Sequence, residues 1–126
     1  MRLFVLLIVC GLSLAACATP YQKDNMFFEG YSDFAMPNHQ YSVAFQGNGN
    51  TDQNTVRKYW YRRSAEICGG MNNFEIVEGA VAGQGLIKNS FNENGVIWTN
   101  NSYNPLHPRW HAQGVIQCKG SGTATR

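Results

Sequence analysis

The most regular pattern in the sequence is a strand-like alternation that passes directly into a helical stripe. From Gln40 to Gln46 apolar side chains alternate with polar or small ones, which is the period of a half-buried β-strand. The segment 51–68 then places side chains at helical spacing, and Gly69-Gly70 is a strong helix stop signal. The stripe consists of Val56, Trp60, Ser64 and Ile67, with Tyr61 and Cys68 beside it. This order favours folds in which a helix covers a sheet.

The residues between this strand and this helix are typical of a turn with positive φ angles that is followed by the start of a helix. Residues 47–50 read Gly-Asn-Gly-Asn, and both residue types tolerate positive φ in turns. Thr51 is the predicted N-cap, and Asp52 suits the positive end of the helix dipole. A phosphate-binding loop is the alternative, but the Gly-Lys-Ser/Thr ending of a P-loop is missing. A strand-end turn therefore explains the segment better.

Further strands are expected after the helix. The runs with strand character are residues 73–78, 86–87, 96–99 and 114–119. Phe74 and Ile76 would face the core, and Ile116 and Cys118 would share one face of the last strand. The element order predicts an α+β fold, with one helix packed on a mainly antiparallel sheet.

The N-terminal segment has the pattern of an export signal. Arg2 provides the positive charge, and an apolar run follows from Leu3 to Leu12. This run is far shorter than the roughly 20 residues of a membrane-spanning helix, and it has the length of the apolar region of a signal peptide. The segment ends in the string Leu-Ala-Ala-Cys at residues 14–17.

That string resembles the lipobox of bacterial lipoproteins and matches it at all four positions. The resemblance implies cleavage before Cys17, a thioether-linked lipid on its sulfur, and acylation of the new amino group, with palmitate as the expected chain. Two or more acyl chains anchor a protein stably, whereas one binds marginally. An ordinary secretory signal that ends in cysteine is the alternative. Because Ala18 is not aspartate, the sorting rule of enteric bacteria favours the outer membrane.

These features divide the chain into four parts. Residues 1–16 are the predicted signal peptide, 17–23 the lipidated cysteine and its tether, 24–119 a single α+β domain, and 120–126 a flexible tail. The tether would extend at most about 20 Å. The domain is therefore expected close to the membrane surface, on the periplasmic face of the outer membrane.

The four cysteines have separate expected roles. Cys10 leaves with the signal peptide and Cys17 carries the lipid, so Cys68 and Cys118 remain. In an exported chain such a pair predicts a disulfide. The disulfide would tie the C-terminus of the helix to the last strand.

A redox pair and a metal site are the alternatives for these two cysteines. No Cys-x-x-Cys motif occurs in the sequence, which argues against the redox pair. A metal site would have to add His107 and His111, but Pro108 disfavours a helix there, so their spacing loses its meaning. Neither a metal nor a cofactor is therefore expected.

Composition argues against nucleic acid as a partner. Ten basic and eight acidic residues give a formal charge of +2, and 14% of the 126 residues are charged. A nucleic-acid-binding protein needs a dense basic face. Aromatic residues make up 13% of the chain, which with so few charges indicates a packed core rather than disorder.

No catalytic arrangement is evident in the motifs. Ser32 lacks the Gly-x-Ser-x-Gly context of a nucleophile elbow, and Asp33 is expected to form an Asx turn. Glu75 and Glu78 stand three residues apart on a strand, which directs them to opposite faces and argues against paired carboxylates. His39 is expected in solvent. No catalytic residue is assigned, and the protein is expected not to be an enzyme.

Charged residues on the helix have the spacing of ion pairs. Glu66 follows Arg62 by four residues and Arg63 by three. Surface pairs that each contribute a few tenths of a kcal/mol are the favoured interpretation. A buried glutamate–arginine clamp or an anion site is the alternative.

Aromatic side chains stand in and around a polar, proline-containing loop at residues 100–108. Exposed aromatic residues mark contacts with proteins or glycans. The candidate interaction residues are Trp98, Tyr103, His107 and Trp110. The alternative, favoured for the two tryptophans, places Trp98 and Trp110 in the core on adjacent strands.

Several short segments together resemble a known family. They are Gly-Tyr-Ser-Asp at 30–33, the strand 41–45, Gly-Asn-Gly at 47–49, Thr51, and Arg-Ser-Ala-Glu at 63–66. Over residues 19–78 the chain resembles an uncharacterised family of small proteobacterial outer-membrane lipoproteins. Ser64 stands where the family has alanine, and Cys68 and Cys118 are not part of the family pattern. The resemblance implies an envelope lipoprotein with an α+β domain, and it implies no activity.

The sequence thus favours a non-enzymatic accessory or interaction protein that faces the periplasm. Its expected partners are the membrane, through the lipid on Cys17, and an envelope protein. The alternatives are a ligand-binding or enzyme-inhibiting protein that acts on cell-wall material, and an envelope sensor. The sensor rests only on an architectural likeness to lipid-anchored, disulfide-bonded α+β domains.

Overall fold

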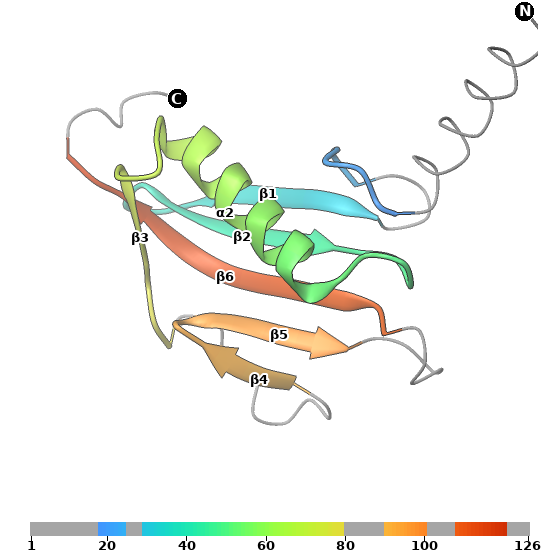
Figure 1. Ribbon diagram of the computed structural model, residues 1–126. Helices are drawn as coiled ribbons and strands as arrows, with labels where there is room; N and C mark the ends of the chain where they lie inside the picture. Colours follow the sequence, from blue (N-terminus) through green and yellow to red (C-terminus); the bar gives the residue numbers. More distant parts are fainter. Residues whose placement is uncertain (1–17, 25–28, 80–89, 101–107, 121–126) are drawn as a thin grey trace, which may run out of the picture.

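The computed structural model describes residues 18–24, 29–79, 90–100 and 108–120. The elements are β1 (Gly30–Met36), β2 (Gln40–Gln46), α2 (Gln53–Cys68), β3 (Phe74–Ile76), β4 (Ser90–Glu93), β5 (Val96–Asn100) and β6 (Trp110–Cys118). Helix α2 lies across one face of the sheet (Figure 1). The predicted α+β class, with one helix on an antiparallel sheet, is confirmed.

The last strand is the centre of the sheet. The strand order is β1-β2-β6-β5-β4, and the strand pairs among the described residues are antiparallel. Strand β3 pairs with the C-terminal part of β6, and β5 pairs with its N-terminal part. Both therefore share one edge of β6, while β2 occupies the other edge.

The register of β2 and β6 defines the face that the helix covers. Val43 opposes Gly114 and Phe45 opposes Ala112, and these positions lie beneath α2. The indole of Trp60 reaches across this face, where its Nε1 donates a 2.8 Å hydrogen bond to the carbonyl oxygen of Val43. A Cβ at position 114 would come within 2.9 Å of the same indole ring. Because Gly114 has no side chain, it leaves room for the indole of Trp60, which is the largest core side chain of the helix.

The buried stripe of α2 differs from the predicted one at its last member. Its residues are Val56, Trp60, Ser64 and Cys68, whereas Ile67 is only half-buried. Because these residues are four apart, they share one helix face. The hydroxyl of Ser64 tolerates burial because it donates to the carbonyl oxygen of Trp60 at 3.0 Å. Gly69 ends the helix with a φ of 86°, as its sequence position predicts.

The N-cap of α2 is Asp52, and the prediction of Thr51 is wrong. The Asp52 carboxylate accepts a 2.7 Å hydrogen bond from the Thr55 amide, and this bond lowers the pKa of Asp52. The hydroxyl of Thr51 is used elsewhere, because it accepts from the Thr19 amide and donates to the side chain of Asn48. Threonine and aspartate are both good N-caps. The contact with Thr19 decides between them.

The predicted strand at 40–46 is confirmed with the same bounds, and three others are confirmed with shifted bounds. Strand β3 is shorter than predicted, β5 extends to Asn100, and β6 already begins at Trp110. Strands β1 and β4 were not predicted. Both lie at the edges of the sheet, where Phe34 and Phe91 remain exposed and the alternation is weak. The predicted strand 86–87 lies outside the described residues.

The predicted disulfide between Cys68 and Cys118 is confirmed. Their Cα atoms are 5.2 Å apart, and the bond joins the last residue of α2 to the last residue of β6. The sulfurs bridge a separation of 50 residues. On the loop-entropy model, a crosslink of this span stabilises the folded state by roughly 4 kcal/mol.

Candidate functional site

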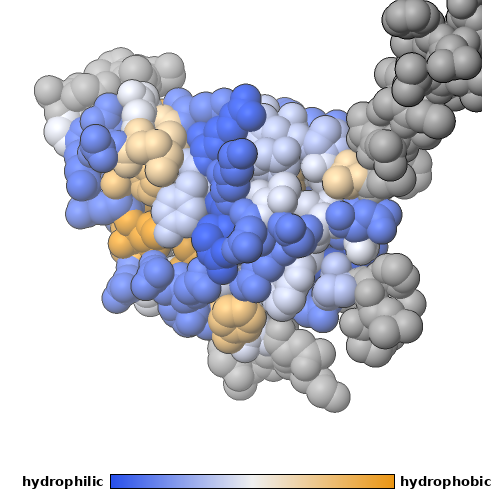
Figure 2. Space-filling view, viewed as in Figure 1, coloured by the Kyte–Doolittle hydropathy of each residue, from blue (hydrophilic) through white to orange (hydrophobic). Residues whose placement is uncertain are grey.

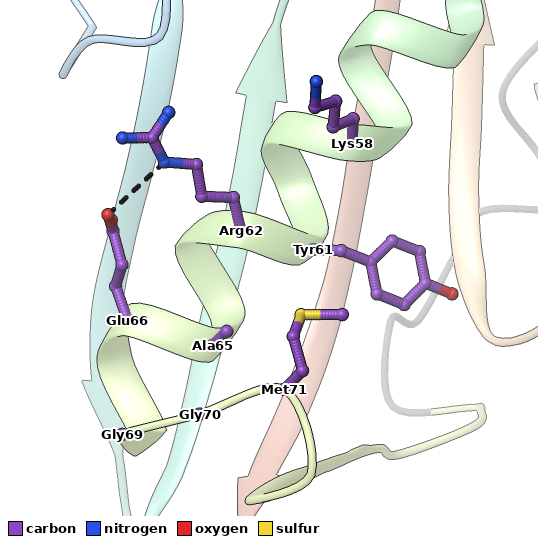
Figure 3. Close-up of a pocket in the computed structure, with 8 residues that line it drawn as sticks. All are labelled: Lys58, Tyr61, Arg62, Ala65, Glu66, Gly69, Gly70 and Met71. Atoms are coloured by element: carbon purple, nitrogen blue, oxygen red, sulfur yellow. Dashed lines mark ion pairs between the residues drawn. The ribbon is translucent and has the colours of Figure 1, made fainter.

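The outward face of α2 and the segment after it form a shallow groove of about 660 Å³. Its lining residues, drawn in Figure 3, are Lys58, Tyr61, Arg62, Ala65, Glu66, Gly69, Gly70 and Met71. The lining is mainly apolar. Figure 2 shows hydrophobic surface gathered where α2 ends and β3 begins, next to a hydrophilic band along the helix.

The end of the helix creates this groove. Gly69 adopts a left-handed conformation, and the amide of Gly70 donates a 2.8 Å hydrogen bond to the carbonyl oxygen of Ala65. The chain therefore turns back, and neither glycine fills the floor with a side chain. Met71 follows as one wall and is 57% exposed. Its side chain extends toward the ring of Tyr61 (Figure 3).

The rim of the groove is cationic. Arg62 pairs with Glu66 at 3.6 Å, and Arg63 pairs with the same carboxylate at 3.5 Å. The predicted helical ion pairs are thus confirmed, and together with Asp33, which also pairs with Arg63, the two arginines are balanced by two carboxylates. Lys58 forms no ion pair with any residue that the structure describes. The groove therefore presents uncompensated positive charge beside an apolar floor.

A half-buried arginine clamp is present, but its carboxylate is Asp33 and not Glu66. Arg63 donates from Nε and Nη2 to the two oxygens of Asp33, at 2.6 and 3.3 Å. Its guanidinium also lies 4.3 Å from the ring centroid of Tyr31. The hydrogen bond that Arg63 donates to Asp33 raises the pKa of Arg63. The predicted Asx turn at Asp33 is wrong, because this residue belongs to β1 and its side chain is held by the helix.

Residues 18–24, called here the N-terminal strap, are docked on the domain, although the sequence assigned most of them to a tether. Thr19 is 2% exposed. Its amide donates to the hydroxyl of Thr51 and its own hydroxyl accepts from the Asn48 amide, both at 2.8 Å. Further along, the Tyr31 amide donates to the Gln22 carbonyl oxygen at 2.8 Å. The strap thus forms a short parallel bridge between Lys23 and Tyr31, alongside β1.

Tyr21 fills the corner between the strap, β1 and α2. Its ring stacks on Tyr31 at a centroid distance of 5.2 Å and lies 5.4 Å from the ring of Tyr59. The guanidinium of Arg62 lies 3.9 Å from the centroid of Tyr21, and the phenol hydroxyl donates to Glu66. Burial and this hydrogen bond raise the pKa of Tyr21. An aromatic residue in an otherwise polar tether was the signal that sequence reasoning missed.

The predicted interaction loop is only partly described. Trp98 is 1% exposed and Trp110 is half-buried, and their rings meet edge to face at 6.3 Å. This matches the alternative in which both tryptophans belong to the core. Tyr103 and His107 lie outside the described residues, and so does Cys17.

The other candidate residues are not brought together into one catalytic group. Ser32 and Asp33 are adjacent on β1, so they face opposite sides of the sheet. His39 is exposed at the turn after β1. His111 hydrogen-bonds to Gln46 at 3.1 Å, and burial lowers the pKa of its imidazole. In the described ranges no group of three or more histidine, cysteine, aspartate or glutamate side chains could hold a metal ion.

Comparison with family models, with curated proteins and with solved structures finds no match for this chain. The resemblance to a lipoprotein family therefore stays a prediction. Within the described part of the chain, no helix has the length and apolar character needed to cross a bilayer.

Proposed function

We propose that the protein is a lipid-anchored envelope lipoprotein whose domain binds another envelope protein through the groove on α2. The lipid would be on Cys17, and the domain would face the periplasm from the outer membrane. The groove is the observation that carries this proposal. The Cys68–Cys118 disulfide supports it, because such bonds persist in oxidising compartments such as the periplasm.

The chemistry of the groove indicates the kind of partner. An exposed apolar surface with a polar rim is typical of protein contacts, and the flexible side chain of Met71 can adapt to different shapes. Lys58 at the rim, which forms no ion pair with a described residue, favours a carboxylate on the partner by charge complementarity. The expected occupant is a protein segment with an apolar side chain next to an aspartate or glutamate.

The lipid anchor is tested by metabolic labelling with an alkyne fatty acid. Wild-type protein and the matched control Cys10→Ser should both carry the label, because Cys10 lies in the part that the signal peptidase removes. Cys17→Ser should carry none and should leave the membrane fraction after a high-salt wash. Label on the Cys17→Ser protein would refute the anchor.

The groove is tested by photocrosslinking in intact cells from an azidophenylalanine at position 71. The matched control carries the same residue at position 34, because Phe34 is 63% exposed and Met71 is 57% exposed. Position 34 lies on the sheet face opposite α2, so it should not reach the same partner. We expect one dominant adduct from position 71 alone, and its loss when Lys58→Glu reverses the rim charge. An adduct that survives this reversal, or that forms equally from position 34, would contradict the proposed site.

A polar recess favours a second candidate, the binding of a small ligand from cell-wall material. The recess has a volume of about 180 Å³ and is lined by Asp24, Gly30, Ser32, Gln46 and His111. Its amide, hydroxyl and imidazole groups suit a ligand with several hydroxyl or amide groups. Titration with muropeptides, followed by the NMR signals of the His111 ring, tests this candidate. Unchanged signals would exclude it.

A further inference from the structure

We infer that the domain rests on lipid headgroups with the end formed by Thr19 and the β2–α2 turn (residues 47–52), called here the anchor end. The C-terminal part of the groove, at Met71, is then held at the opposite end. This inference rests on the proposed lipid at Cys17. It deepens the proposed function, because it states which surface meets the bilayer and which surface is presented to a partner.

The first argument is the length of chain between the lipid and the fold. Thr19 is fixed in the turn by its two hydrogen bonds to Thr51 and Asn48. Only Ala18 separates it from Cys17. Because consecutive Cα atoms are 3.8 Å apart, the Cα of Cys17 lies within about 8 Å of the Cα of Thr19. The lipid therefore leaves the domain directly at the anchor end, without a free spacer.

The second argument is that the strap is held along its length and not only at Thr19. The Asp24 amide donates to the carbonyl oxygen of Tyr31 at 2.8 Å, and Tyr21 is packed between aromatic rings and Arg62. Gly30 permits this close approach, because a Cβ there would lie 2.4 Å from the carbonyl oxygen of Gln22. Several independent contacts would have to break together before the strap became a flexible tether.

The third argument is the direction of α2. The helix begins at the anchor end and runs for 16 residues, which is about 24 Å at 1.5 Å per residue. Met71 lies just beyond its far end. In Figure 1 the strap, in blue, and the turn before α2 lie at one end of the molecule, and the C-terminal end of the helix lies at the other. The fold therefore keeps Met71 and the C-terminal part of the groove away from the bilayer.

The orientation is tested on the full lipidated protein, purified from membranes and reconstituted in phosphatidylethanolamine–phosphatidylglycerol vesicles that contain headgroup-spin-labelled lipid. A fluorescent amino acid replaces either exposed Asn50, in the anchor end, or Met71. We expect strong loss of fluorescence from position 50 and little from position 71. Equal loss at both positions, or the reverse order, would overturn the inference.

A strap variant and a matched control identify the cause of the orientation. Tyr21→Ala removes the central strap contact but leaves the hydrogen bonds of Thr19 in place, so it should reduce the difference in quenching between the two positions. Phe34→Ala removes an exposed ring from the other sheet face and should leave the difference unchanged. If Tyr21→Ala keeps the full difference, the strap is not what orients the domain.

Amide hydrogen exchange separates failure of the strap from failure of the lipid anchor. The amides of Thr19 and Asp24 should be protected in the full chain and equally in Cys17→Ser. Exchange at the rate of a free peptide would overturn the inference even in a lipidated protein. Protected amides together with no fatty acid on Cys17 would instead refute the proposed function and leave only the docked strap.

Discussion

The two flanks of α2 are held to the sheet by the same device, an arginine that pairs with a strand carboxylate and lies over an aromatic ring. On the β1 flank, Arg63 makes two hydrogen bonds to Asp33 and lies 4.3 Å from the centroid of Tyr31. The strap closes over this flank through Tyr21, and the side chains of the ion pair are 25% and 18% exposed.

On the β4 flank, the corresponding arginine–carboxylate pair is more exposed to solvent. Arg57 donates to both oxygens of Glu93, at 2.8 and 3.0 Å, and lies 5.0 Å from the centroid of Trp98. Here the side chains of the pair are 30% and 37% exposed. Ion pairs in water contribute little, whereas removal of one partner costs more where the other stays partly desolvated. Although the two ion pairs have similar geometry, the less exposed Arg63–Asp33 pair should therefore contribute more to stability than the Arg57–Glu93 pair.

The largest effect should come from the core that both flanks share. Trp60→Ala empties the space beneath α2, and we expect a loss of about 3–5 kcal/mol in the free energy of unfolding. Urea denaturation of the full chain measures this loss. Lys58→Ala, on the outward face of the same helix, should change stability by less than about 0.5 kcal/mol. A loss of similar size in both variants would mean that the helix is not held by its buried stripe.

Breaking the enclosed pair should have the next largest effect. Asp33→Ala leaves the Arg63 guanidinium without its bidentate partner, and hydrogen bonds to charged groups contribute about 1.5–3 kcal/mol. We expect a loss in that range, and a double-mutant cycle with Arg63→Ala should assign most of it to the pair. Additive effects in the cycle would show that the two side chains do not act together.

Breaking the open pair should cost less and should depend on salt. Glu93→Ala is expected to lower the free energy of unfolding by about 0.5 kcal/mol, as for other exposed pairs. Because salt screens exposed charges, the loss should shrink between 0.1 and 1 M sodium chloride, where the Debye length falls from about 10 to about 3 Å. If Glu93→Ala costs as much as Asp33→Ala, the strap does not distinguish the two flanks.

The smallest effect concerns the phenol that closes the β1 flank. The pKa of Tyr21 is raised above its ordinary value of 10.0, so the folded state favours the neutral phenol. The resulting stability is present below pH 10 and is lost as the pH rises above it. Tyr21→Phe cannot ionise, and its stability should fall less steeply above pH 10 than that of the wild type. Parallel pH profiles would show that this hydroxyl does not couple ionisation to folding.

The sequence alone determined the features that depend on local periodicity and on compartment. The strand Gln40–Gln46, most of the buried helical stripe and the stop at Gly69 follow from side-chain spacing within one element. The Cys68–Cys118 bond, which the structure contains, follows from elimination among the four cysteines once export of the chain is predicted. Together these features were sufficient for the α+β class, because a strand pattern next to an amphipathic helix needs a sheet beneath the helix.

Only the tertiary structure decided the features that join distant residues. Asp33 meets Arg63 across 30 residues, Thr19 meets Thr51 across 32, and Tyr21 meets Glu66 across 45. Each of these side chains also has a plausible local role, as a turn former, an N-cap or a tether residue. The choice between the local and the distant role depends on which partners the packed helix and sheet bring within hydrogen-bond range. Spacing along the sequence does not determine the distance in space between residues that are 30 or more positions apart.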